Sequence, residues 1–142
     1  LFRSEELLPN GYVPYRTEWF VFDEEHRLAG SIDMTYQVDV NDPNKLVIYD
    51  WKRSCKLSIK QNRFQQMKPP LQEFADVSFW HYAMQLNIYR RILETKYDKT
   101  IEGMFLVGLH PDLDEPQVER VPLLETETEA IFQQRRKQLR EM

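Results

Sequence analysis

The stretch LVIYDWKRS, residues 46–54, places an aspartate and a lysine two positions apart at the end of an apolar run. The β-branched and aromatic residues of that run predict a buried strand. Side chains alternate across a strand, so Asp50 and Lys52 point to one face and Trp51 to the other. Burying a carboxylate or an ammonium is costly unless the group is paired or binds a metal. The pair is therefore either a simple ion pair at a strand end or part of a reactive site, and both interpretations stay open here.

Two more carboxylates fall on the strands predicted before this one. Residues 15–22 alternate as a strand that carries Glu18, and residues 28–40 form a second strand that contains Asp33. Clustered carboxylates raise one another's pKa, so Glu18, Asp33 and Asp50 are best explained by a cation among them. Mg²⁺ and Mn²⁺ prefer such oxygen ligands and keep several waters.

A divalent cation at this place predicts phosphate chemistry. It would polarise a phosphate and lower the pKa of a water molecule, which then becomes a nucleophile. Lys52 would place a compact positive charge where negative charge develops in the transition state.

A helix predicted over residues 79–96 contains neither glycine nor proline, and its apolar residues recur at helical spacing. His81, Gln85 and Tyr89 follow one another at intervals of four and form a polar stripe. The glutamine and the tyrosine could reach the phosphate, the water or the lysine. They could equally be ordinary residues at the boundary of the core.

The remaining elements complete an α/β pattern. Polar turns at residues 23–26 and 41–44 join the first three strands into an antiparallel meander. The other predicted elements are a short helix or loop at 56–76, a strand at 100–109, an edge strand at 117–121 and an amphipathic helix at 125–142. The 142 residues predict one domain, and the first residue, Leu1, makes the chain an expected piece of a longer protein.

Composition excludes several classes of protein. The one cysteine, Cys55, cannot support a disulfide framework or an iron–sulfur cluster with four cysteines from this chain, and it favours an intracellular, reducing compartment. No apolar run approaches the roughly 20 residues of a membrane-spanning helix, so no membrane partner is expected.

The net charge of −4 argues weakly against nucleic acid, yet residues 51–72 contain no acid. The basic residues of that segment that could hold a phosphate backbone are Arg53, Lys56, Lys60 and Arg63. A solvated basic loop is the alternative.

Three motifs occur in a recognisable order: Gly30-Ser31-Ile32-Asp33, Asp50-Trp51-Lys52 and a glutamine at 85 with a tyrosine at 89. This set resembles the PD-(D/E)XK nuclease superfamily, in particular its RecB-like and exonuclease V-like branch, over residues 18–89. The resemblance implies a restriction-endonuclease-like core with a mixed central sheet flanked by helices. It also implies an Mg²⁺- or Mn²⁺-dependent deoxyribonuclease, an exonuclease rather than an endonuclease, of the kind that serves DNA repair and recombination.

The resemblance also implies roles for individual residues. Asp33, Asp50 and the main-chain carbonyl of Trp51 would bind the metal, and Glu18 would help to hold the metal or its water. Lys52 would position the attacking water, with Gln85 and Tyr89 supporting the site. Many relatives have a histidine ligand before the first acid, and none precedes Glu18 here. That difference leaves the number of metals open.

Two alternatives remain. A nuclease-like module could bind nucleic acid or a protein without cutting, since a fold does not establish chemistry. RNA could be the substrate, because contacts to a 2′-hydroxyl have no short sequence signature.

Overall fold

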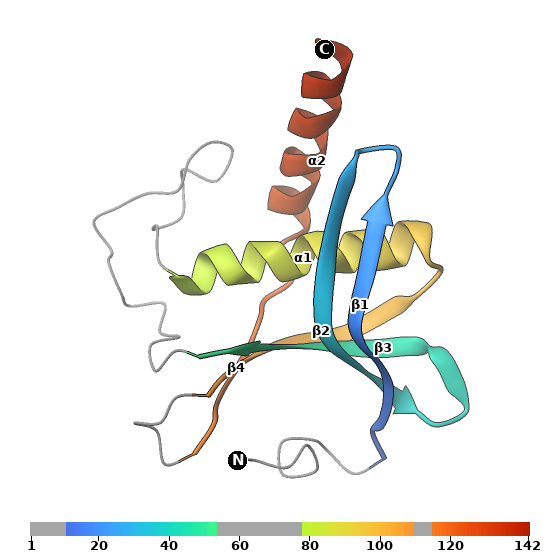
Figure 1. Ribbon diagram of the computed structural model, residues 1–142, viewed down its shortest axis with the longest axis vertical. Helices are drawn as coiled ribbons and strands as arrows, with labels where there is room; N and C mark the ends of the chain where they lie inside the picture. The colour runs from blue at the N-terminus through green and yellow to red at the C-terminus, as the bar shows by residue number, and fades with distance from the viewer. Residues whose placement is uncertain (1–10, 54–77, 110–114) are drawn as a thin grey trace.

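The computed structural model describes residues 11–53, 78–109 and 115–142. Five strands and two helices follow one another within these ranges (Figure 1). In chain order they are β1 (Val13–Asp23), β2 (Leu28–Asp39), β3 (Asp42–Lys52), α1 (Ser78–Lys96), β4 (Thr100–Gly108), β5 (Gln117–Arg120) and α2 (Glu125–Arg140).

The strands form one mixed sheet in the order β1-β2-β3-β4-β5. β1, β2 and β3 make the antiparallel meander, β3 and β4 are parallel, and β5 returns antiparallel to β4. Parallel neighbours need a crossover connection, and α1 lies within the one between β3 and β4. β1 and β2 bend away from the direction of β3 and β4 (Figure 1). The predicted α/β fold with a mixed sheet and flanking helices is confirmed.

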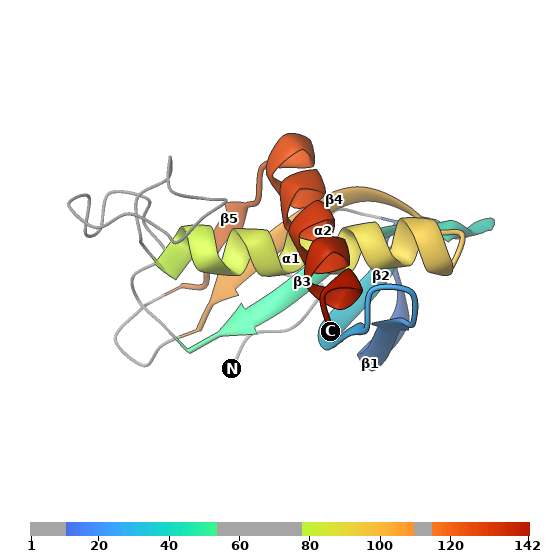
Figure 2. The ribbon, with the colours of Figure 1, turned by 90° about the horizontal axis from the view of Figure 1, so that it is seen from above.

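Both helices belong to the larger core. That core joins β1–β4 to the apolar side of α1 and to Phe132 of α2. α2 crosses over α1 (Figure 2). The buried Asn87 of α1 fixes this crossing, because its side-chain amide donates to the carbonyls of Ala83 (2.8 Å) and Pro122 (3.1 Å). Its oxygen accepts the N–H of Leu124, at 2.9 Å, just before α2 begins. Both the N–H groups and the oxygen of the buried Asn87 amide therefore have hydrogen-bond partners.

A smaller aromatic core covers the other face of the sheet. Its buried members are Met34, Tyr36, Val47, Tyr49 and Val107. The Tyr49 ring meets that of Tyr36 edge to face, with centroids 5.3 Å apart. Apolar packing on both faces explains the continuous buried run of β3, since a strand covered on both sides cannot alternate apolar and polar residues.

The elements agree with their predicted ranges within a few residues, with one correction. Asp42, Pro43 and Asn44 were predicted in a turn, but β3 already begins at Asp42. The structure places the turn at residues 40–41, and an N–H bond from Asn41 to Oδ1 of Asp39 supports it. The element predicted at 56–76 and the loop residues 110–114 lie outside the described residues. The single domain stays a prediction.

Neither helix in the described part of the chain has the length and apolar composition needed to cross a bilayer.

Candidate active site

The sheet opens into a fork where β2 and β3 separate. The last paired residues of the two strands at this end are Met34 and Tyr49. In the same register, Asp33 and Asp50 would face each other one step further on. β3 continues alongside β4 as far as Lys52, whereas β2 continues alongside β1. The two aspartates therefore occupy the mouth of the fork, where no backbone partner fills the space between the strands.

The chain of β2 also rotates at Asp33. Ile32 packs in the core under the helices, while Met34, two residues later, packs in the core on the opposite face. Residues two apart normally share a face, so the alternation breaks between them. This break lets the Asp33 carboxylate turn toward β3. There Oδ2 of Asp33 accepts the backbone N–H of Trp51 at 2.9 Å and takes the place of the missing carbonyl of β2.

Asp50 is the buried member of the pair, with 5% of its surface exposed. The pKa of Asp50 is raised to about 6, mainly by burial and then by a hydrogen bond with the Asp33 side chain and that group's negative charge, against the lowering effect of Lys52. Nζ of Lys52 lies 2.9 Å from Oδ2 of Asp50. Apart from this ion pair, Oδ2 has no hydrogen bond of regular geometry among the described residues. The acids are thus adjacent, and one lysine compensates them only in part.

The Lys52 ammonium also meets a residue that no motif indicated. Its Nζ lies 4.3 Å from the centroid of the Tyr82 ring on α1. Tyr82 precedes Gln85 by three residues and Tyr89 by seven, so a helical projection places it on their face of the helix. That spacing is the signal in the sequence that could have found it. The predicted stripe began at His81 instead.

Tyr89 closes the site from the helix side and is 8% exposed. Burial, and then the negative charge of Asp50, raise the pKa of its phenol, while hydrogen bonds with Gln85 and the backbone of Ser31 act in the opposite direction. Its ring lies against Gly30: a Cβ added there would be 2.7 Å from Cζ and 2.8 Å from Oη of Tyr89. Gly30 is therefore needed for this close approach of helix and strand.

Gln85 is exposed, and it lines a groove of about 390 Å³ with His81, Tyr89 and apolar residues of both helices. The stripe predicted from the sequence is thus one wall of a groove. The two end residues of the stripe have different surroundings, because Tyr89 is close to Asp50 whereas His81 is exposed.

Glu18 lies beside the acid pair and does not join it closely. Together with Thr17, Asp33, Met34 and Trp51, it lines an open depression of about 460 Å³. Its side chain is exposed, and its backbone has a φ of +44°, a left-handed conformation that is uncommon for glutamate. Its carboxylate does not come within 4.8 Å of both Asp33 and Asp50. A cation shared by all three acids would require the Glu18 side chain to turn inward.

Of the remaining predicted site residues, the structure describes Trp51 and Arg53. The indole of Trp51 packs beside Tyr49 in the smaller core, with ring centroids 5.9 Å apart, on the face opposite Asp50 as predicted. Arg53 is exposed immediately after β3. Lys56, Lys60 and Arg63 lie outside the described residues.

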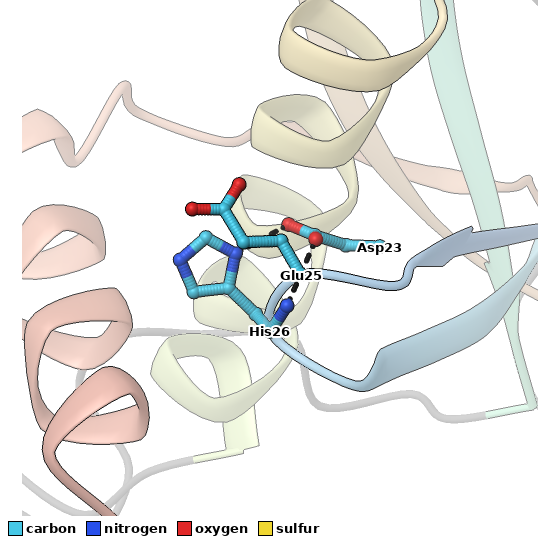
Figure 3. A group of neighbouring side chains, drawn as sticks. All are labelled: Asp23, Glu25 and His26. Atoms are coloured by element: carbon cyan, nitrogen blue, oxygen red, sulfur yellow. Dashed lines mark hydrogen bonds and ion pairs between the residues drawn. The ribbon is translucent and has the colours of Figure 1, made fainter. Parts of the chain in front are cut away.

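A second acidic group gathers at the turn between β1 and β2 (Figure 3). Ligand atoms of Asp23, Glu25 and His26 lie within 4.8 Å of one another. These atoms already have partners, however. Nδ1 of His26 is 2.7 Å from Oδ2 of Asp23, and its Nε2 is 2.9 Å from the Arg136 guanidinium. A guanidinium can only donate, so Nε2 accepts and Nδ1 carries the proton.

The carboxylates of this turn are also occupied. Nζ of Lys96 lies 2.6 Å from Glu25 and 3.9 Å from Asp23. Arg135 of α2 donates to the carbonyl of His26 at 2.9 Å. With three cationic side chains around it (Lys96, Arg135 and Arg136) and both imidazole nitrogens already bonded, this group ties the β1–β2 turn to α1 and α2.

Comparison with known proteins finds a weak structural similarity. No family model and no curated protein matches the chain. The chain is similar to the crystal structure of a presumed exonuclease from Eubacterium rectale, with 15% identity and a TM-score of 0.48. The alignment covers 89% of this chain and 43% of that protein, so the chain spans less than half of its length. At that identity, the residues of this chain must support any functional conclusion.

Proposed function

We propose that this chain is a metal-dependent nuclease that hydrolyses phosphodiester bonds of DNA, as an exonuclease in preference to an endonuclease. The observation that supports the proposal is the buried Asp50 carboxylate at the mouth of the fork, next to Asp33 in the register of β2 and β3, with the ammonium of Lys52 at 2.9 Å from Asp50. A purely structural ion pair needs one carboxylate for one lysine. The second acid at the fork adds a repulsion that a divalent cation would relieve.

The donor set suits a small, hard cation. Asp33 and Asp50 would each supply carboxylate oxygens, the Trp51 carbonyl would supply a neutral oxygen, and Glu18 would contribute directly or through water. Mg²⁺ or Mn²⁺ bound there would polarise the phosphate and activate a water molecule. The chain itself contributes Lys52, which orients that water and offsets the charge that develops on the phosphoryl oxygens. Gln85 and Tyr89, hydrogen-bonded to each other, hold the helix side of the site.

The test is cleavage of labelled DNA, single- and double-stranded, linear and circular, with Mg²⁺, with Mn²⁺ and with chelator. We expect the linear forms to be cut with either metal and no form to be cut with chelator. Cleavage of circular DNA would show that the protein is an endonuclease and not an exonuclease. Binding of DNA with no cutting under any condition would favour the nuclease-like binding module.

Lys52→Met tests the assigned chemistry. We expect cleavage to fall by about 100-fold or more, because a charge aimed at the transition state is lost. The folded state and its stabilisation by Mn²⁺ should remain. Lys99→Met is a matched control, since Lys99 also lies over a tyrosine ring, 4.8 Å from the centroid of Tyr15, away from the acids. Cleavage by Lys52→Met at the rate of Lys99→Met would refute the role of Lys52.

A further inference from the structure

The ammonium of Lys52 has contacts with two elements of the fold. Oδ2 of Asp50 lies 2.9 Å from Nζ, and the centroid of the Tyr82 ring lies 4.3 Å from it. The first contact comes from the same strand, so it moves together with the lysine. The second comes from α1 and therefore fixes the ammonium relative to the helix that also carries Gln85 and Tyr89.

We propose that Tyr82 is a positioning residue that holds the Lys52 ammonium at the acid pair through the face of its ring. This inference rests on the proposed nuclease function and goes beyond it, since neither the three motifs nor any comparison assigns a role to Tyr82. The physical basis is the quadrupole of the aromatic ring, whose negative face attracts a cation within about 6 Å of the centroid.

The geometry explains why a lysine at this place needs such a partner. A lysine side chain has four rotatable carbon–carbon bonds, and Lys52 is half-buried, so an ion pair alone leaves the ammonium several rotamers. The Tyr82 ring contacts the ammonium through its face and offers no competing acceptor at its centre. The ammonium thereby keeps its N–H groups for the carboxylate and for the substrate.

The kinetic test separates the ring from its hydroxyl. Tyr82→Phe keeps the aromatic face, and we expect kcat within about threefold of the wild type. Tyr82→Leu removes the face, and kcat should fall about tenfold, which is about 1.4 kcal/mol of transition-state stabilisation, with KM for DNA unchanged. A fall in both variants, or a change confined to KM, would overturn the proposal.

Two controls distinguish positioning from structural loss. Tyr97→Leu removes a half-buried tyrosine just past the end of α1, where the ring meets Trp19 at 5.6 Å. It should lower the unfolding temperature and leave kcat unchanged. In a Lys52→Met background, Tyr82→Leu should change the residual rate less than twofold, because its effect requires the lysine. An undiminished tenfold loss in that background would show that Tyr82 acts without Lys52.

A second measurement does not depend on activity. Lysines reductively methylated with ¹³C report their surroundings by NMR, and the Lys52 signal is identified by its absence in Lys52→Met. We expect a ring-current shift upfield in the wild type that persists in Tyr82→Phe and disappears in Tyr82→Leu. An unshifted signal in the wild type rejects the contact. A shifted signal in a protein that cuts no DNA rejects the nuclease and leaves the contact.

Discussion

Asp50→Asn should stabilise the protein in the absence of metal, at neutral pH. The folded protein raises the pKa of Asp50 from 3.8 to about 6, so the folded state binds the proton more tightly than the unfolded chain. The contribution of protonated Asp50 to the stability of the folded state is therefore complete below pH 3.8 and is lost as the pH rises through about 6. At pH 7 the group opposes folding, and asparagine removes this opposition.

The size of the effect follows from the shift. A difference of about 2 pKa units corresponds at most to about 3 kcal/mol, and we expect about 1–2 kcal/mol because the adjacent depression of about 460 Å³ admits water and ions. The assay is urea unfolding of wild type and Asp50→Asn in chelator, from pH 4 to pH 8. Carboxylates remote from the fork titrate equally in both proteins, so the difference between the two curves reports Asp50 together with its neighbour Asp33.

The expected difference in the free energy of unfolding grows between pH 4 and about pH 6.5 and is then constant. Glu102→Gln, which neutralises an exposed acid of β4, should show no such growth. Mn²⁺ at tenfold above its dissociation constant should then stabilise the wild type at pH 7 by about 1.4 kcal/mol and leave Asp50→Asn unaffected. A variant that is less stable than the wild type at pH 7 in chelator would refute the reasoning, because it would show that the Asp50 charge favours the fold.

Two further substitutions test the surroundings of the site. Gly30→Ala should lower the free energy of unfolding by about 1–3 kcal/mol and reduce cleavage, because its Cβ would overlap the Tyr89 ring. Adding Tyr89→Leu to this variant should recover stability but not activity. A Gly30→Ala protein with unchanged stability would contradict the close approach of Gly30 and Tyr89. Asn87→Leu should cost about 2–3 kcal/mol in urea unfolding, because it leaves the N–H of Leu124 and the Pro122 carbonyl without their partner. A loss below 0.5 kcal/mol, as a rough threshold, would show that water replaces the amide.

Local patterns in the sequence predicted much of this fold because its strands and helices are locally regular. The turn predicted at residues 23–26 and found at 24–27, the apolar run of β3 and the long helix without glycine or proline each carry their own signal in the sequence. The adjacency of Asp33 and Asp50 followed from the same logic, since an antiparallel meander brings successive strands together. The turn before β3 was placed too late because Pro43 and Asn44 favour turns in isolation, yet the pairing of Asp42 with Asp39 includes them in the strand.

The fork itself had no signal in the sequence. It arises because β2 continues alongside β1 while β3 continues alongside β4, and the pairing of β3 with β4 joins strands that are distant in the sequence. The left-handed backbone at Glu18 was equally hidden, since glutamate has no preference for that conformation. The contact between Lys52 and Tyr82 joins residues 30 positions apart across a segment without clear periodicity. Tertiary packing, and not local propensity, decides each of these features.

These features share a physical consequence: the candidate site lies where the fold leaves backbone groups without a strand partner and buries an unfavourable charge. At the fork, Trp51 donates its N–H to a carboxylate because no strand offers a carbonyl, and Asp50 is buried although its charge opposes folding. A sequence selected only for stability would place an asparagine or an apolar residue at position 50. The retained carboxylate pair and the ammonium held between two elements are what a cation and a phosphate would require. The increase in stability of Asp50→Asn and the loss of cleavage in Lys52→Met should therefore occur together, as two effects of one arrangement.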